Sequence, residues 1–244
     1  MIQPIPIQPI TGSGIEIING RNEKTKTREY KGMIIWKDNS IYEGHLQNDL
    51  PNGRGRKLFA DMRHYDGEFK EGKPHGKGTM VYPSGGYYIG DWIDGTREGE
   101  GVEEMNGKKY KGEFKEDARN GYGVWTWDDN KYIGPVLNGV PEGYGVFTWA
   151  NKKKYEGEWN DGKPNGKGKM YHDNKLIYEG EFAKGKKHGK GVLVTSDGDR
   201  YKGVWVHNKK EGEVVISGDG KPTIITTWEN NNIVMVKEGV VESN

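Results

Sequence analysis

The stretch Tyr155–Gly168 reads YEGEWNDGKPNGKG, and it returns as YEGEFAKGKKHGKG at Tyr178–Gly191. Such Tyr-x-Gly triplets recur every 22 or 23 residues, and a glycine follows each tyrosine at a distance of eleven residues. A fixed repeat of this length is typical of one supersecondary unit stacked on copies of itself. The eight copies begin at Tyr42, Tyr65, Tyr88, Tyr110, Tyr132, Tyr155, Tyr178 and Tyr201.

Each copy is expected to form a β-hairpin. Tyrosine, glycine and a bulky residue alternate, as in Tyr155, Gly157 and Trp159, and this period of two places them on one face of a strand. Glu156 and Glu158 then lie on the other face, which is expected to be solvated. Seven residues after each tyrosine stands a residue type that tolerates positive φ, which predicts the turn. The turn residues are Gly72, Gly95, Gly139, Gly162 and Gly185, or else Asp49, Asp117 and Asn208.

The composition agrees with an extended sheet more than with a globule. Only 32% of the 244 residues are hydrophobic, whereas 30% are charged and 39 are glycine. The 14 Tyr and 8 Trp suit a half-wet surface. No segment has a helical period. We therefore predict an all-β fold: an elongated, single-layer antiparallel β-meander of about 18 strands, curved and twisted because flat sheets of many strands are unusual.

Three regions are expected along the chain. Ile and Pro alternate near the N-terminus, so residues 1–29 are predicted to form an extended arm. Residues 30–217 are predicted to form the repeat sheet, in which Tyr30–Ser40 matches the second half of a unit and would act as a capping strand. The repeat degenerates where Val214 replaces the second glycine of the pair, and residues 218–244 are predicted to cap the other end.

Charge and cysteine content exclude several classes of protein. A net charge of +1 argues against nucleic-acid binding through the overall field, and the absence of cysteine excludes disulfides, thiolate chemistry and zinc ribbons. There is no apolar run long enough for a transmembrane helix, and the N-terminus lacks the basic segment of a signal peptide. We expect a cytoplasmic, cytoskeleton-associated protein.

The motifs that resemble catalytic chemistry are weak. Gly72–Thr79 has some likeness to a phosphate loop, but its spacing is one residue short and no helix follows, so a turn entering a strand is favoured. The six histidines fall in different units, which gives no metal-binding spacing. Carboxylates on alternate positions repeat in every unit, as a solvated face would. We therefore expect no enzymatic activity, no metal and no cofactor.

The repeated motif resembles the MORN repeat (membrane occupation and recognition nexus). The resemblance rests on YEGEW-x-x-G-K-x-x-G-x-G, as at Tyr155–Gly168, and covers residues 30–217. It implies a curved antiparallel meander with an aromatic-lined groove, in a stand-alone scaffold without the catalytic domains that some members carry. The departures are local: Leu46 and Val136 replace the aromatic residue, and Pro135 predicts a bulge or a bend in the unit 132–145.

Aromatic residues are densest in the fourth and fifth units. Two interpretations remain open: the rings stack along the repeat and hold it together, or they form an exposed strip that binds a partner segment, since Tyr and Trp are common interface anchors. The second interpretation predicts these partner-binding residues: Trp92, Phe114, Trp125, Trp127, Phe147, Trp149, Tyr155 and Trp159.

Two function classes follow. The first is a scaffold that docks protein segments within a cytoskeletal assembly, and the resemblance extends to the radial-spoke head subunits of ciliary axonemes. Its partners would be other subunits, a second copy or the chain's own arm. The alternative is a peripheral membrane adaptor that binds acidic phospholipids through Lys152–Lys154, Lys184–Lys190 and Lys209–Lys210. These lysines are interleaved with carboxylates, and each basic residue adds only about 1 kcal/mol at a membrane surface.

Overall fold

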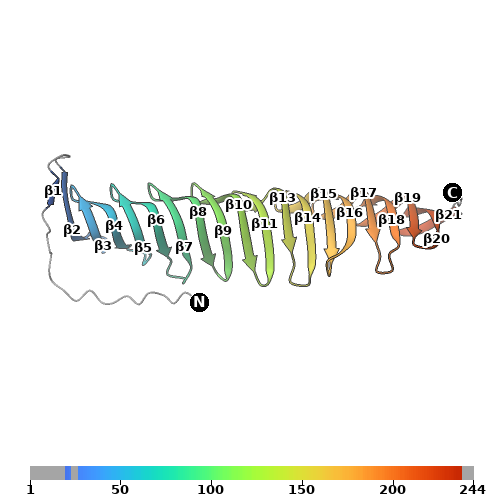
Figure 1. Cartoon of the computed structure of the whole chain (residues 1–244), viewed down its shortest axis with the longest axis horizontal. Helices are drawn as coiled ribbons and strands as arrows, with labels where there is room; N and C mark the ends of the chain where they lie inside the picture. The colour runs from blue at the N-terminus through green and yellow to red at the C-terminus, as the bar shows by residue number, and fades with distance from the viewer. Residues whose placement is uncertain (1–19, 23–26, 238–244) are drawn as a thin grey trace. The chain divides into compact units, whose positions relative to one another are not determined.

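The computed structural model describes residues 20–22 and 27–237, which fall into two compact units, one ending at Thr96 and the other beginning at Arg97. The described residues form strands, turns and bends, with no helix. Within each unit the strands follow one another in chain order (Figure 1). The predicted all-β antiparallel meander is confirmed. Most of the arm predicted for residues 1–29 lies outside the described residues, as does the end of the cap predicted for residues 218–244.

The strands pair as consecutive antiparallel neighbours inside each unit. The strands of the first unit are β1 (Gly20–Asn22), β2 (Thr27–Ile35), β3 (Ile41–Gln47), β4 (Leu50–Leu58), β5 (His64–Lys70), β6 (Lys73–Val81) and β7 (Tyr87–Ile93).

The second unit repeats this arrangement from β8 to β21. Its strands are β8 (Thr96–Met105), β9 (Lys108–Lys115), β10 (Ala118–Trp127), β11 (Asn130–Leu137), β12 (Val140–Pro141), β13 (Gly143–Thr148), β14 (Lys153–Asn160), β15 (Lys163–His172), β16 (Lys175–Ala183), β17 (Lys186–Val194), β18 (Arg200–Val206), β19 (Lys209–Gly218), β20 (Lys221–Glu229) and β21 (Asn232–Lys237).

The number of strands differs from the sequence-based expectation of about 18, since the described residues form 21. One cause is the sequence repeat that contains Pro135. After β11 the chain makes the two-residue strand β12 and then β13, and both pair with β11. Between them the Glu142 N–H donates to the Pro135 carbonyl at 3.1 Å. The predicted irregularity is therefore an interrupted strand.

The hairpin turns lie where the sequence predicts them. All eight residues at the seventh position after the tyrosine have positive φ, for example +80° at Gly185, +65° at Asp117 and +73° at Asn208. The preceding residue also has positive φ, including 50° at Lys184 and 49° at His207. Two successive positive φ values define a type I′ turn, whose twist matches that of the flanking strands. The repeat pattern predicted only the second of these two residues, because the first is Glu71, Glu116 or Lys184 in some repeats, and such residues rarely adopt positive φ.

At Gly185 the effect of backbone strain on stability can be measured separately from steric contact, because an added Cβ would meet no atom within 4 Å. Gly185→Val is expected to lower the free energy of unfolding by about 1–3 kcal/mol through backbone strain alone. Gly185→Asn should cost much less, since Asn208 adopts the same conformation at the same repeat position. Urea unfolding of the two variants measures this difference. Equal losses would contradict the requirement for positive φ.

The repeated tyrosines form the centre of the core. The first seven are at most 1% exposed, and each hydroxyl donates to the backbone carbonyl three residues later, at 2.6–3.2 Å. The ring of Tyr155 lies over the glycine pair Gly157 and Gly168, which face each other on β14 and β15. A Cβ on Gly168 would stand 2.5 Å from the tyrosine ring. The glycines therefore make room for the ring.

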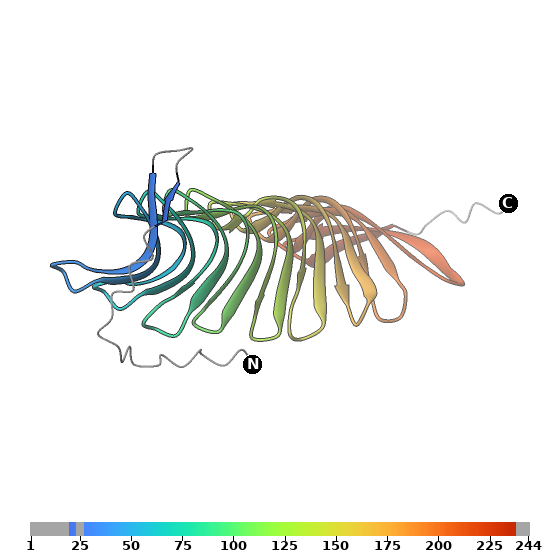
Figure 2. The same ribbon diagram turned by 60° about the vertical axis from the view of Figure 1, so that its left-hand side comes forward.

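Neighbouring repeats are joined by rings in edge-to-face contact. The Tyr155 ring centroid is 5.3 Å from that of Trp159 in its own repeat and 5.0 Å from that of Phe182 in the next. Edge-to-face pairs at this distance add stability beyond area burial. Figure 2 shows strands bent into arcs in both units. A single sheet has no second layer, so burial this complete requires the rings to lie on the inner side of these arcs. We call this surface the aromatic face.

A hydrogen bond that recurs in three repeats involves the second glutamate of YEGEW. The Glu158 carboxylate accepts the backbone N–H of Lys167 at 2.9 Å, at a point where the pairing of β14 with β15 shifts register. Glu113 and Glu181 accept the N–H groups of Tyr122 and Lys190 in the same way. An irregular strand leaves N–H groups without a ladder partner. These glutamates satisfy them.

Burial of the tyrosines predicts sensitivity to alkaline pH. Desolvation raises the pKa of Tyr110 to about 12 and raises the pKa values of Tyr42, Tyr65, Tyr132, Tyr155 and Tyr178 well above 10. A raised folded-state pKa gives stability that is complete below the unfolded-state value near 10 and is lost as the pH rises towards the folded-state value. The melting temperature should be constant between pH 7 and 9 and fall steeply above pH 10. A flat profile to pH 12 would contradict this burial.

Candidate protein-binding face

Four of the predicted binding residues form a connected strip beside the tyrosine core. We call Trp125, Trp127, Phe147 and Trp149 the tryptophan strip. The centroid distances are 5.6 Å from Trp125 to Trp127, 5.5 Å from Trp127 to Phe147 and 4.5 Å from Phe147 to Trp149. Other repeats have a single ring or a smaller side chain at the repeat position of Trp127, the last residue of β10, and of Trp149, which directly follows β13. All four residues are half-buried, so part of each ring faces solvent.

The other four predicted binding residues lie in the core. Trp92 in the first unit is 4% exposed, and in the second unit Phe114, Tyr155 and Trp159 are 3%, 0% and 6% exposed. The Trp159 ring contacts Tyr132 at 5.4 Å, and its Nε1 donates to the Gly145 carbonyl at 3.1 Å. These four rings join repeats to one another. The strip, by contrast, is half-buried, so binding of a partner there stays a prediction.

A buried ion cluster adjoins the strip. Glu103 is only 6% exposed, and it faces Tyr110 across the ladder between β8 and β9. Arg97 Nη1 lies 2.6 Å from Glu103 Oε1, and Arg119 Nε lies 2.7 Å from Oε2. The Arg119 guanidinium also covers the Trp125 ring at 4.5 Å. Two cations therefore share one carboxylate against the aromatic face.

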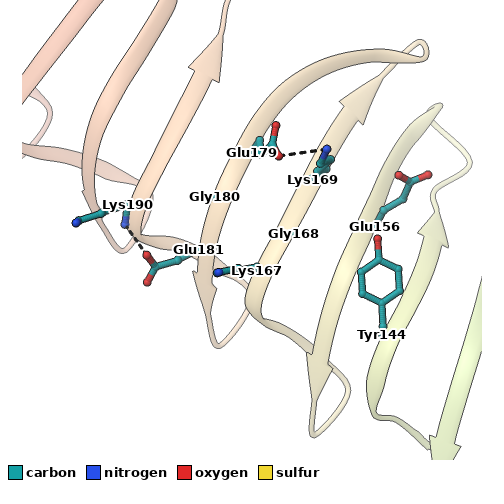
Figure 3. Close-up of a pocket in the computed structure, with 9 residues that line it drawn as sticks. All are labelled: Tyr144, Glu156, Lys167, Gly168, Lys169, Glu179, Gly180, Glu181 and Lys190. Atoms are coloured by element: carbon teal, nitrogen blue, oxygen red, sulfur yellow. Dashed lines mark hydrogen bonds and ion pairs between the residues drawn. The ribbon is translucent and has the colours of Figure 1, made fainter.

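The opposite face of the sheet is charged and locally neutral. Figure 3 shows a shallow hollow there, of about 350 Å³, whose side chains come from β13 to β17. Lys169 pairs with Glu179 at 3.2 Å and Lys154 pairs with Glu156 at 2.6 Å. The exposed ring of Tyr144 stands at one side (Figure 3). This face carries paired charges of both signs, as expected from the alternating Glu and Lys of the repeat.

The described residues do not hold a group of three or more His, Cys, Asp or Glu side chains that could bind a metal ion. Within the same residues, 20–22 and 27–237, no helix is long and apolar enough to cross a membrane.

The family of the chain follows from its repeats. The family model described as "MORN repeat" matches eight times, and the matched residues are 42–61, 65–87, 88–106, 110–132, 132–154, 155–175, 178–200 and 201–213. The chain belongs to the MORN-repeat family. The matches cover more than half of it, and they begin at the tyrosines whose rings form the core. No curated protein matches the chain.

Solved structures show a similar fold. The TCP10 domain of Danio rerio CPAP, in complex with a peptide of Danio rerio STIL, matches with a TM-score of 0.50 and 10% identity, over 86% of this MORN-repeat chain and 95% of that chain. The TCP domain of Drosophila melanogaster SAS-4, with a proline-rich motif of Ana2, has a TM-score of 0.20 and 11% identity, over 81% and 90% of the two chains. BamB from Moraxella catarrhalis has a TM-score of 0.18 and 9% identity, over 86% and 88%. Because the other two TM-scores are below 0.5, only the first structure supports an argument, and at 10% identity that argument concerns the fold alone.

The sequence patterns did not predict one charged position on the aromatic face. Nine residues after the repeat tyrosine, four copies have proline (Pro51, Pro74, Pro141 and Pro164), whereas the other four have a cation. In each of those four the cation lies over a ring of the aromatic face. The division between proline and cation at this position is visible when the eight repeats are aligned. The spacing of the repeat gave no reason to expect a charged group on the aromatic face.

Proposed function

We propose that this MORN-repeat protein is a non-enzymatic scaffold that binds extended segments of partner proteins along the tryptophan strip. The observation that carries the proposal is a connected row of four half-buried aromatic residues, next to repeat tyrosines of which the first seven are fully buried. Aromatic side chains give large contact area at low entropic cost, which suits a shallow surface. The peptide-bound CPAP domain, similar in fold, supports a sheet of this kind as a platform for peptides.

We further propose a cytoskeletal assembly as the setting, with the radial spoke head of the ciliary axoneme as the specific candidate. The resemblance to stand-alone MORN subunits of that assembly supports it. The partners would then be neighbouring subunits, and the protein would be cytoplasmic and bound to the cytoskeleton.

The test replaces the two indoles that contact Phe147 within the strip. Trp127→Ala with Trp149→Ala is expected to reduce capture of axonemal subunits from an extract of ciliated cells by at least tenfold, because large apolar anchors dominate such interfaces. The matched control is Tyr122→Ala with Tyr144→Ala. Tyr122 lies on β10 with Trp127, and Tyr144 lies on β13, which ends one residue before Trp149; these two rings are 57% and 64% exposed and occupy the charged face. Capture by the control should equal that by wild type. Equal capture by both double variants would refute binding at the strip.

The alternative function, a peripheral membrane adaptor, has a separate test. Lys154 pairs with Glu156 at 2.6 Å and Lys152 with Asp173 at 3.5 Å, so the first lysine cluster is partly neutralised within the protein. The scaffold proposal therefore predicts background sedimentation with anionic liposomes. Strong sedimentation that is lost in Lys152→Gln, Lys153→Gln, Lys154→Gln would favour the membrane adaptor.

A further inference from the structure

Two lysines on the aromatic face lie at the repeat position nine residues after the tyrosine. Lys187 Nζ stands 4.9 Å from the Tyr178 ring centroid and 5.2 Å from that of Trp205. Lys210 Nζ stands 3.9 Å from the Trp228 ring and 5.8 Å from the same Trp205 ring. Both side chains are half-buried. Two ammonium groups of like charge therefore flank one indole.

These lysines lack the counter-ion that the equivalent arginines have. Arg97 and Arg119 occupy the same repeat position, and they share the carboxylate of Glu103, fifteen residues after its repeat tyrosine. In the repeat that begins at Tyr178, that position holds Leu193. Among the described residues no carboxylate lies within 4.0 Å of either ammonium group. The only polar side chain bonded to one of them is Asn231, whose Oδ1 is 3.2 Å from Lys210 Nζ.

The surroundings make this charge costly. Burial lowers the pKa values of both lysines, and the nearby Lys210 lowers that of Lys187 further. The indole between the two lysines also has an unmet donor, because the Nε1 of Trp205 is buried and has no acceptor in the described part of the chain. In Trp92 and Trp159 the same atom donates to a glycine carbonyl, at 3.2 and 3.1 Å. Half-buried ammonium groups without a carboxylate partner are donors that an incoming anion would satisfy.

We propose that Lys187 and Lys210 form an anchor for a carboxylate side chain of an acidic partner segment bound on the aromatic face. The proposal rests on the proposed function, and it adds the chemistry of the partner. A carboxylate is the anion the structure itself selects, because Glu103 occupies the corresponding place between Arg97 and Arg119. Here the partner supplies the carboxylate, because this chain has Leu193 at that position.

The test compares two labelled peptides of about ten residues, one of alternating proline and glutamate and one of alternating proline and glutamine. Both are extended, because proline favours the polyproline conformation. Wild type is expected to bind the glutamate peptide at least tenfold more tightly than the glutamine peptide in low salt. Lys187→Gln with Lys210→Gln should remove that preference. Leu193→Glu should remove it too, by supplying an internal carboxylate while keeping both lysines.

The matched control is Lys186→Gln with Lys209→Gln, which removes the same charge from the adjacent, exposed positions. It should keep the preference for the glutamate peptide. No preference in wild type, a preference that survives in the Lys187/Lys210 variant, or an equal loss in the control would each overturn the proposal. Binding of phosphatidylserine vesicles that depends on Lys187 and Lys210, without a preference for the glutamate peptide, would assign the pair to a membrane instead. The strip variants measured above decide the proposed function separately.

Discussion

Gly168→Val is expected to lower the free energy of unfolding by about 3 kcal/mol or more, the range for loss of a buried aromatic side chain. The added Cβ would stand 2.5 Å from the Cε2 and hydroxyl of Tyr155, so the ring must leave its place over the glycine pair. Its hydrogen bond to the Glu158 carbonyl and its edge-to-face contacts with Trp159 and Phe182 would then be lost.

The last repeat already shows this outcome. Val214 occupies the position of the second glycine, and a Cβ on the facing Gly203 would meet its Cγ2 at 2.7 Å. Tyr201 is correspondingly half-buried, and in the described structure its hydroxyl makes no hydrogen bond of the kind the other seven make. The larger residue at the glycine position thus coincides with a displaced tyrosine.

Urea unfolding followed by near-ultraviolet circular dichroism measures the effect of Gly168→Val. The control is Lys169→Val, one residue further along β15 and exposed on the charged face, which should change stability by no more than about 0.5 kcal/mol. A Gly168→Val variant as stable as this control would show that the ring does not need the glycine pair.

The sequence predicted the features of the fold that repeat. The spacing of tyrosine and glycine, the alternation of Tyr155, Gly157 and Trp159, and the residue types at the turns each specify backbone geometry directly, and the hairpins form as predicted. The register shift beside Glu158 was not predicted. A glutamate on a solvated face looks the same in sequence whether or not it accepts a backbone N–H.

The candidate site was harder to predict, because burial depends on how the strands curve. Trp159 and Trp149 are equally aromatic in sequence, yet the first is closed off by its neighbours and the second is half exposed. The cations escaped prediction for a related reason. Charged side chains normally mark the solvated face, whereas Arg119 and Lys187 extend over rings of the aromatic face.

Removal of the buried carboxylate is the second change expected to have a large effect. Glu103→Gln leaves Arg97 and Arg119, which are 17% and 21% exposed, without their shared counter-ion. Breaking a buried ion pair by removing one partner costs about 3 kcal/mol or more, since the remaining charges stay buried. Arg97 keeps its contact with Asp117 at 3.2 Å, which limits the loss. Glu100→Gln removes the same charge from an exposed position and should cost less than about 1 kcal/mol.

A triple variant separates the charge effect from packing. Other repeats have proline at the two arginine positions and an apolar side chain at the glutamate position, as in Pro74 and Met80. Arg97→Pro with Arg119→Pro and Glu103→Met removes all three charges together, and replacing a buried ion cluster by apolar residues is often neutral. This variant should recover more than half of the stability lost in Glu103→Gln, although the Arg97 N–H that donates to Asp117 is gone. If the triple variant is less stable than Glu103→Gln, the ion cluster stabilises the sheet by more than the neutralisation of its own charges. The absence of a carboxylate between Lys187 and Lys210 would then lower the stability of the folded chain, and it would also leave a binding position for a partner's carboxylate.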